Sequence, residues 1–274
     1  MNNQEWAPYF EEKPMLTNVA PLVHCITNEI TQELLANGLL FIGAKPIMAE
    51  DTREFPALFE KTDSLFLNLG KLSPTKEASL IAASQMAGKK PVVLDIVGAA
   101  ATPLRLLLAL RLSKNHPTVL KGNISEMRAF CGLKTKSRGV DGDRSDQGMD
   151  QLLELIEGLQ KLDSSITYLA TGVKDVIVHQ KQVYLMENGV HELDRFTGTG
   201  DLVGALIAAF LGRGMPPLLA TLRGVSYLNC CGEIAKQKLL PTIGMADFRH
   251  ETLNQLSLLE QQTEWWKKVK GRCM

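Results

Sequence analysis

The sequence predicts an α/β fold with a mostly parallel central sheet, helices covering both faces and an antiparallel hairpin at one edge. Short apolar runs alternate with helix-like segments through the middle of the chain, which is typical of strands buried on both faces. Two more apolar runs, separated by Lys181, predict the hairpin. The chain has 274 residues, of which 45% are hydrophobic, so it can bury a large core. We expect one domain over residues 1–274.

Four predicted strands follow one another, and each is a short apolar run that ends at glycine or asparagine. They are 64–70, 92–98, 117–123 and 165–172. After the first strand, Ser73 and Pro74 supply an N-cap and a first-turn proline for a helix. A second helix is predicted directly after the third strand, at residues 124–132.

The pattern changes in the second half of the chain. Residues 134–150 are rich in charge and glycine, which predicts a solvated loop between two helices. We expect no domain boundary there, because strands and helices continue after it, including the hairpin at residues 175–188. From Pro216 onward the pattern is helical, with a long helical segment predicted from Asp247 to Val269.

Charge and composition exclude several classes of function. The chain has 30 basic and 30 acidic residues, so no nucleic-acid or anionic-membrane partner is expected. The N-terminus has no secretory signal, and the apolar runs are too short to span a bilayer. The five cysteines lack metal-ligand spacing and are Cys25, Cys131, Cys230, Cys231 and Cys273. We therefore expect a reduced, cytoplasmic protein without a zinc site or disulfide framework.

The most informative motif is the turn Phe196-Thr-Gly-Thr-Gly-Asp201, which leads into an apolar helix-like run. Glycines allow backbone amides to approach a ligand closely, and a helix that starts there directs its partial positive end at the same place. Both features favour a bound phosphate. A carboxylate within such a turn needs a purpose, and removal of a proton is the simplest one. The motif predicts phosphoryl transfer to an alcohol.

Polar residues also follow the predicted strands at the point where each strand ends. In open parallel sheets, ligands bind beyond the carboxyl ends of the strands. Any one of these residues alone would be interpreted as a turn or a helix cap, but several clusters in the same topological position favour a binding site. They are Asn68, Asp95 with Gly98, Lys121 to Asn123, Thr171 with Gly172, and Gly198 to Asp201.

Residues at the ends of two of these strands have two interpretations each. Asn123 and Glu126 fit a helix capping box, and Glu126 could also position Mg²⁺ near a triphosphate; both can hold together. Lys121 is suited to a phosphate oxygen, or it is a solvated surface lysine. Asp95 ends an apolar strand, so its carboxylate must be paired with a cation or exposed in a cleft.

Two residues nearer the N-terminus are also candidates. His24 precedes a predicted helix, where a histidine is more often a hydrogen-bonded structural residue than a catalyst. Met48 could be an ordinary core thioether or the soft wall of a pocket for an aromatic, sulfur-containing ligand.

From about Pro21 to about Ala235 the chain resembles hydroxyethylthiazole kinases, the thiamine-salvage branch of the ribokinase-like superfamily. The resemblance rests on motifs in the order of that family. They are PLVHCITNEIT, ANGLLFIGAKPIMAE, LNLG, VVLDIVGAAATP, KGNISE, ATG and FTGTGD. It implies a ribokinase-like fold and ATP-dependent phosphorylation of the primary alcohol of 4-methyl-5-(2-hydroxyethyl)thiazole, with Mg²⁺ as cofactor. It also implies a homotrimer with its sites between subunits.

The same resemblance implies roles for individual residues. Met48 would contact the thiazole through its backbone, and Gly198 would line the pocket of the alcohol. Lys121 and Thr171 would bind ATP. The role of Asp201 as general base rests on the turn itself and not on this resemblance. The remaining roles follow the same motifs: Gly198, Thr199 and Gly200 would form the anion hole, and Asn123 and Glu126, with Asp95 nearby, the magnesium and phosphate network.

The chain departs from the pattern of hydroxyethylthiazole kinases at three positions. Lys121 replaces a usual arginine, which exchanges a bidentate fork for a point charge of the same sign. Ile96 stands where proline is usual. Asp201 stands where cysteine is common, and because a carboxylate is ordinarily ionised at pH 7 and a thiol is not, we expect a better base.

Two alternatives remain at this point. The string Gly198-Thr-Gly-Asp201 also resembles hydroxymethylpyrimidine kinases and the dehydratases of hydrated nicotinamide cofactors, although the motifs HCITN and KPIMAE favour the thiazole. A non-catalytic thiazole or nucleotide sensor on the same fold is a further possibility. It is less favoured, because a degenerate sensor is expected to lose its base or its glycines.

Overall fold

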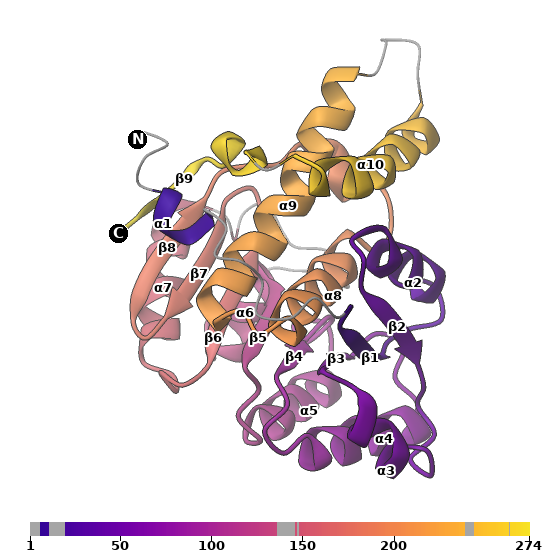
Figure 1. Cartoon of the computed structure of the whole chain (residues 1–274). Helices are drawn as coiled ribbons and strands as arrows, with labels where there is room; N and C mark the ends of the chain where they lie inside the picture. Colours follow the sequence, from indigo (N-terminus) through magenta and orange to yellow (C-terminus); the bar gives the residue numbers. More distant parts are fainter. Residues whose placement is uncertain (1–5, 11–19, 136–145, 147, 239–243, 263) are drawn as a thin grey trace.

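The computed structural model describes residues 6–10, 20–135, 146, 148–238, 244–262 and 264–274. Most of the loop predicted at residues 134–150 lies outside these ranges, and the next helix begins at Met149. Figure 1 shows the path of the chain, with α1 and β9, from its two ends, both near β8 at one edge of the sheet. Within the described ranges, no helix has the length and apolar character needed to cross a membrane.

Nine strands of the described chain form one sheet in the order β2-β1-β3-β4-β5-β6-β7-β8-β9. The strands from β2 to β6 in this order run parallel, and β7, β8 and β9 are antiparallel additions at one edge. The predicted sheet and its edge hairpin are therefore confirmed. The strands are β1 (Leu22–Ile26), β2 (Lys45–Met48), β3 (Ser64–Asn68), β4 (Val92–Asp95), β5 (Val119–Asn123), β6 (Thr167–Thr171), β7 (Asp175–His179), β8 (Gln182–Met186) and β9 (Gly271–Cys273).

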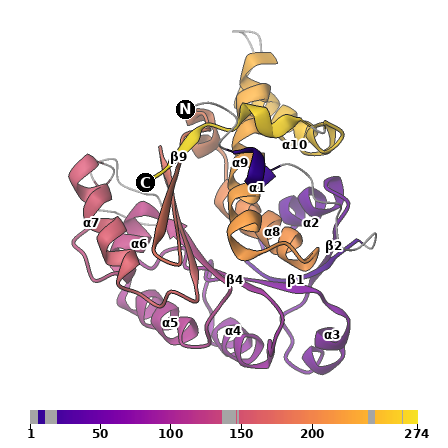
Figure 2. The same ribbon diagram turned by 60° about the vertical axis from the view of Figure 1, so that its left-hand side comes forward.

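Helices cover both faces of the sheet, as Figure 2 shows in a view along its edge. One face carries α2, α8 and α9, with α1 and α10 packed outside them; the other carries α3 to α7. Those of the first group are α1 (Ala7–Phe10), α2 (Gln32–Phe41), α8 (Thr199–Gly212), α9 (Pro217–Lys238) and α10 (Met245–Glu260). Those of the second are α3 (Phe55–Lys61), α4 (Pro74–Met86), α5 (Pro103–Ser113), α6 (Ile124–Phe130) and α7 (Met149–Gln160).

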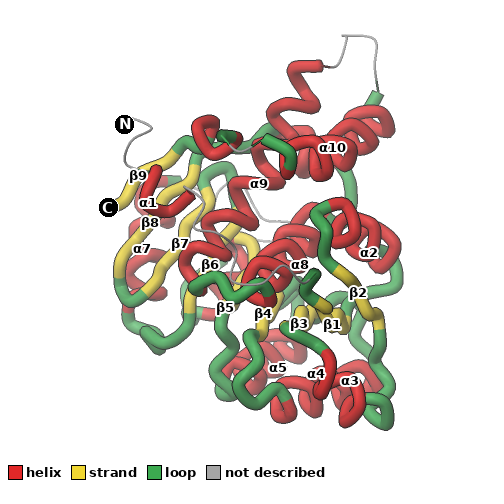
Figure 3. The backbone as a smooth tube through the Cα atoms, in the orientation of Figure 1, coloured by secondary structure: helices red, strands yellow, loops and turns green. Residues whose placement is uncertain are grey.

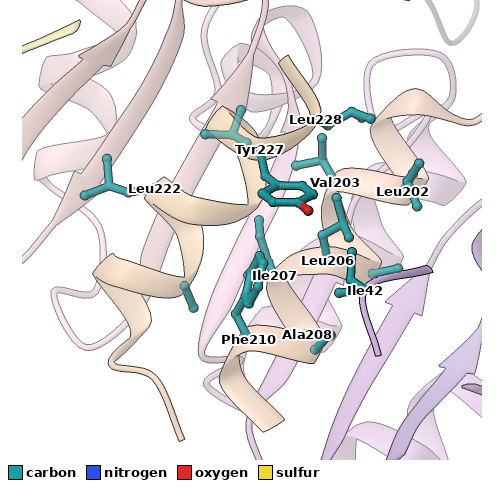
Figure 4. Close-up of a cluster of buried hydrophobic side chains, with 14 of the residues drawn as sticks. Ile42, Leu202, Val203, Leu206, Ile207, Ala208, Phe210, Leu222, Tyr227 and Leu228 are labelled. Carbon is teal, nitrogen blue, oxygen red and sulfur yellow. The ribbon is translucent and has the colours of Figure 1, made fainter. Parts of the chain in front are cut away.

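Helix α8 is the centre of the core on its face of the sheet. Every residue from Asp201 to Leu211 is buried, because the helix lies between the sheet on one side and α9 on the other. Figure 4 shows side chains of α8, including Leu206 and Phe210, on the side of the helix that faces Tyr227 of α9, and the rings of Phe210 and Tyr227 meet edge to face. A helix that is apolar all round is stable only in such a position. The first turn of α8 is therefore held firmly against the sheet.

The structure also corrects the sequence-based expectations near the ends of the chain. Strands β1, β2 and β9 were not predicted, and the expectation of helix from Asp247 to Val269 is wrong beyond Glu260. Figure 3 shows α10 followed by loop, a short 3₁₀ helix at Trp265–Lys268 and the strand β9. The physical reason is the strand pairing of β9 with β8, where Gly271 lies so close to the Leu185 carbonyl that a side chain could not fit.

The close contact between Gly204 and Phe66 allows a test of how tightly α8 packs against the sheet. A Cβ atom at Gly204 of α8 would overlap the Phe66 ring of β3. We expect Gly204→Ala to lower the free energy of unfolding by about 1–3 kcal/mol, because neither the helix nor the buried ring has room to move. Urea denaturation measures this. The matched change Gly158→Ala in α7, where the nearest atoms belong to the half-exposed Cys131, should stay within about 1 kcal/mol of wild type. Equal effects at the two glycines would contradict the expectation.

Candidate active site

The polar residues predicted at the strand ends lie at one edge of the sheet. Asn68, Asp95, Asn123 and Thr171 are the last residues of β3, β4, β5 and β6. The register pairs Asn68 with Asp95, and Asn123 with Thr171. Asp95 pairs with Lys121, so β5 and β6 extend two residues further and the ends form a stepped row. The parallel direction of the strands causes this, because it gathers all their carboxyl ends at the same edge.

The turn before α8 lies against this row. Gly198 has a φ of 98°, in the left-handed region that favours glycine. A Cβ atom there would lie 2.5 Å from Leu34 Cδ2 and 2.9 Å from Thr31 Cγ2, so the position has no room for a side chain. Helix α8 then begins at Thr199 and runs for 14 residues, which leaves the free amides of its first turn at the sheet edge. This arrangement is suited to binding an anion.

Asp201 lies in the first turn of α8 with its carboxylate held by three side chains. Oδ2 accepts hydrogen bonds from Thr31 Oγ1 at 2.6 Å and from Asn28 Nδ2 at 2.8 Å. Oδ1 accepts one from Asn68 Nδ2 at 3.1 Å. The residue is only 8% exposed. Asn68 was predicted at the site, whereas Asn28 and Thr31 were not.

A buried ion pair lies beside the turn. Lys121 Nζ is 2.7 Å from Asp95 Oδ2, and both side chains are almost fully buried. Burial raises the pKa of Asp95, and the charge of Lys121 acts in the opposite direction. The interpretation of Lys121 as a surface lysine is therefore wrong, and Asp95 is paired with a cation. A Cβ atom at Gly200 would lie 3.9 Å from the ammonium, so this cation borders the turn of α8.

Glu126 forms the predicted capping box with Asn123. Glu126 Oε2 accepts from the Asn123 amide at 2.7 Å, and Asn123 Oδ1 accepts from the Glu126 amide at 2.9 Å. Glu126 Oε1 accepts from the Gly98 amide at 2.6 Å, which joins the end of β4 to the start of α6. Burial, reinforced by the nearby charge of Asp95, raises the pKa of Glu126 to about 8.

Two carboxylates close together could help to hold a magnesium ion. The described residues contain no group of three or more His, Cys, Asp or Glu side chains placed to bind a metal. Mg²⁺, however, usually takes only one or two carboxylates and completes its shell with water and phosphate oxygens. The charge of Asp95 helps burial to raise the pKa of Glu126, so a cation nearby would favour the ionised form of Glu126. This oxygen donor set fits Mg²⁺ that arrives with a phosphate group.

His24 and Met48 lie on neighbouring strands at the other end of the row. His24 Nε2 is 2.8 Å from the Ala49 carbonyl, and its ring packs against Phe55 and Phe59. Burial lowers the pKa of His24. The interpretation as a structural histidine is therefore the better one. Met48 ends β2 and is half-buried against the core, with its backbone paired to Cys25 of β1.

The cysteines have no place in the site. All five are free thiols, and Cys25, Cys230 and Cys231 are buried. Burial raises the pKa of Cys25 to about 12, which leaves its thiol protonated and unreactive.

Two cations near the row were also not predicted. Lys76, in the first turn of α4, is 4% exposed and donates from Nζ to the Gly70 carbonyl at 2.7 Å. Arg105 of α5 donates to the carbonyls of Leu69 at 2.6 Å and Val97 at 3.0 Å, and so ties together the segments that follow β3 and β4. For Lys76, the sequence offered only the N-cap at Ser73 as a signal, since that cap places Lys76 in the first turn of its helix.

A small hollow of about 100 Å³ lies next to the strand ends of β5 and β6. Its lining is mainly apolar and consists of Ile124, Met149, Leu152, Val173 and Lys174. Val173 is 72% exposed although it is apolar, and it directly follows Thr171 and Gly172. The hollow therefore offers an apolar surface beside the residues predicted to bind phosphate.

Comparison with known proteins identifies similar chains. Residues 14–262 match the model of the hydroxyethylthiazole kinase family. A hydroxyethylthiazole kinase from Enterococcus faecalis is 54% identical over 261 residues, which cover 93% of this chain and 94% of that protein. One from Lacticaseibacillus paracasei is 52% identical, with coverage of 93% and 92%.

Solved structures show the same fold. A hydroxyethylthiazole kinase protein from Pyrococcus horikoshii superposes with a TM-score of 0.79 at 28% identity, covering 93% of this chain and 94% of that one. A ribokinase-like superfamily protein from Enterococcus faecalis superposes with a TM-score of 0.65 at 14% identity, covering 96% and 95%. The fold is therefore ribokinase-like.

Lys76 gives a pH-dependent prediction. Burial lowers its pKa from 10.5 to about 8, partly opposed by Glu50 and Asp201. Between these pH values the unfolded chain still holds a proton that the folded protein has released, so unfolding becomes harder as pH rises. Lys76→Met removes this effect. We expect the unfolding free energy of wild type minus that of Lys76→Met to increase by about 1–2 kcal/mol from pH 7.5 to 10, as measured by urea denaturation. A difference that does not change with pH would contradict the expectation.

Proposed function

The chain belongs to the hydroxyethylthiazole kinase family, and we propose that it transfers the γ-phosphoryl group of ATP to the primary alcohol of 4-methyl-5-(2-hydroxyethyl)thiazole in thiamine salvage. One observation carries the proposal in atomic terms. The buried Asp201 carboxylate lies in the first turn of α8, at the same sheet edge as the Lys121–Asp95 pair. The proposed proton acceptor therefore lies in the first turn of the helix whose N-terminus is proposed to bind phosphate.

Asp201 is proposed as the general base. The carboxylate accepts the hydroxyl proton of the alcohol while the new oxygen–phosphorus bond forms and the bond to the β-phosphate oxygen breaks. Three neutral hydrogen-bond donors hold the carboxylate in place, and the nearby cation Lys121 is bonded to Asp95 instead. The base is thus held in place without direct pairing to a lysine.

The backbone of the turn is proposed as the anion hole. The amides of Gly198, Thr199 and Gly200, with the dipole of α8, would stabilise negative charge on the transferred group and the β-phosphate. Lys121 would place its ammonium group, which is also bonded to Asp95, next to Gly200. Thr171, at the end of β6, would contact the same nucleotide. Phosphoryl transfer needs mainly this kind of positioning and charge neutralisation.

The metal network would consist of Asp95 and Glu126, with Asn123 fixing the orientation of Glu126. When Mg²⁺ is bound there with ATP, it neutralises charge on the phosphates. The capping box fixes one carboxylate and the Lys121 ion pair fixes the other. The metal-binding groups therefore need little rearrangement when the nucleotide enters.

The two organic parts of the substrates would lie at opposite ends of the row. The thiazole would contact the backbone of Met48, and Gly198 would line the pocket of the alcohol. The apolar hollow beside Val173 is suited to the base of the nucleotide. This places the alcohol and the γ-phosphoryl group between them, next to Asp201.

A homotrimer with sites between subunits is part of the proposal. Ile30 is 75% exposed and lies between Asn28 and Thr31, both of which bind Asp201. An apolar side chain exposed so near the site is suited to contact with a second subunit.

Light scattering on the purified protein tests the assembly. A trimer should give about three times the chain mass of 30.2 kDa. A single-chain mass would reject it, and Ile30→Lys is expected to weaken the trimer because it places a charge in an apolar contact.

Activity assays test the reaction and the base. We expect ATP-dependent phosphorylation of the thiazole alcohol, with hydroxymethylpyrimidine a much poorer acceptor. Asp201→Asn should lower kcat by roughly 10²–10⁴, because the amide cannot accept the proton. Preference for the pyrimidine alcohol would reject the proposed substrate, and near-normal kcat in Asp201→Asn would reject the proposed base.

A further inference from the structure

Thr31 stands where a helix cap is expected but does not act as one. It is the N-cap residue of α2, and a threonine there normally accepts a hydrogen bond from an amide of the first turn. In this structure its side chain makes no such bond. Its hydroxyl instead donates to Asp201 Oδ2 at 2.6 Å, across 170 residues of sequence. Thr31 is also almost fully buried, so this bond is shielded from solvent.

The two amides that bind Asp201 have their orientation fixed by the backbone. Asn28 Oδ1 accepts from the amides of Ile30 at 3.1 Å and Thr31 at 3.2 Å, which turns its Nδ2 towards Asp201. Asn68 Oδ1 accepts from the Gly70 amide at 2.8 Å, with the same result for its own Nδ2. Neither amide can flip without losing these bonds.

Gly70 allows both amides to stand this close together. A Cβ atom there would lie 2.8 Å from Asn68 Oδ1 and 2.9 Å from Asn28 Nδ2. The segment after β3 therefore supports the carboxylate from one side, and the segment before α2 supports it from the other.

These bonds leave one acceptor position of the carboxylate open within the described residues. An ionised carboxylate has about four lone-pair positions. Two on Oδ2 are taken by Thr31 and Asn28, and one on Oδ1 by Asn68. We propose that Thr31 is a positioning residue, which with the two asparagines holds Asp201 so that the remaining lone pair of Oδ1 receives the substrate proton. This rests on the proposed function of the site.

In the proposed step, one proton and one phosphoryl group are transferred. The hydroxyl proton moves to Asp201 Oδ1, the alcohol oxygen bonds to the γ-phosphorus, and the bond from that phosphorus to the β-phosphate oxygen breaks to release ADP. Thr31 keeps its own proton throughout. Its contribution is the angle and distance of Oδ1, and misplacement of a catalytic group by about 1 Å can cost on the order of 100-fold in rate.

The test compares Thr31→Val, Thr31→Ser and Asp201→Asn, with Thr31→Val also made in the Asp201→Asn protein. Valine keeps the shape of threonine without its hydroxyl, and we expect kcat to fall about 10- to 100-fold while the KM for ATP changes less than about twofold. Serine should recover most of the lost rate. In the Asp201→Asn protein, Thr31→Val should have almost no further effect on kcat, because it acts through that carboxylate.

Thr27→Val is the matched control. Thr27 lies four residues earlier in the same segment, and its buried hydroxyl has no hydrogen-bond partner among the described residues. We expect it to leave kcat within about twofold of wild type.

Three outcomes overturn the inference while leaving the proposed function intact. They are an unchanged kcat in Thr31→Val, a serine variant as slow as the valine variant, and equal losses from Thr31→Val with and without the Asp201 carboxylate. A wild-type protein that phosphorylates no alcohol would instead overturn the proposed function, and this inference with it. Unfolding midpoints of all variants show whether any loss of rate is merely loss of folded protein.

Discussion

The burial of α8 is the constraint on which the site depends. A helix that is apolar on every side must lie between the sheet and another helix, and α9 supplies the second surface. Its N-terminus then falls at the carboxyl ends of the parallel strands. Gly198 makes the turn into the helix possible, because the close approach of Leu34 and Thr31 leaves no space for a side chain. The position of Asp201 is therefore a consequence of core packing.

Around this fixed point, charge is distributed in two separate groups. In the first group, Lys121 and Asp95 neutralise each other at 2.7 Å. Glu126 belongs to the same group, because the charge of Asp95 raises its pKa, and both its oxygens accept hydrogen bonds from backbone amides. Asp201 is held by neutral donors only. This separation suits a reaction in which one carboxylate must take up a proton while others remain near the phosphates. It results from strand order, because β4 and β5 carry the ion pair and β3 contributes Asn68.

The sequence predicted those parts of the site that local patterns determine. Polar residues that interrupt apolar runs marked the strand ends, so Asn68, Asp95 and Asn123 were found. The capping box was visible in its three-residue spacing. Asn28 and Thr31 were not found, because their role depends on contact with a residue about 170 positions away, which no local pattern encodes.

The same limit applies to the fold. Strands with uninterrupted apolar runs were predictable, whereas His24 interrupts the run of β1, β2 has a half-exposed pattern and β9 is three residues long. The segment before β9 mixes polar and apolar residues and was interpreted as helix, and only the pairing of β9 with β8 shows that the chain becomes extended there. Lys76 lies in an ordinary helix first turn, and its burial follows from the segment folded over it.

The start of α2 shows how a local stability requirement and a catalytic one can meet at a single group. A capping hydroxyl is typically worth about 0.5–2 kcal/mol to a helix, and Thr31 does not provide it. Of the backbone amides at this end of α2, that of Thr31 donates to Asn28 Oδ1 instead. A mutational search for greater thermal stability would therefore be drawn to this position, and each success there would risk a slower enzyme. The fold and the reaction compete for one hydroxyl group.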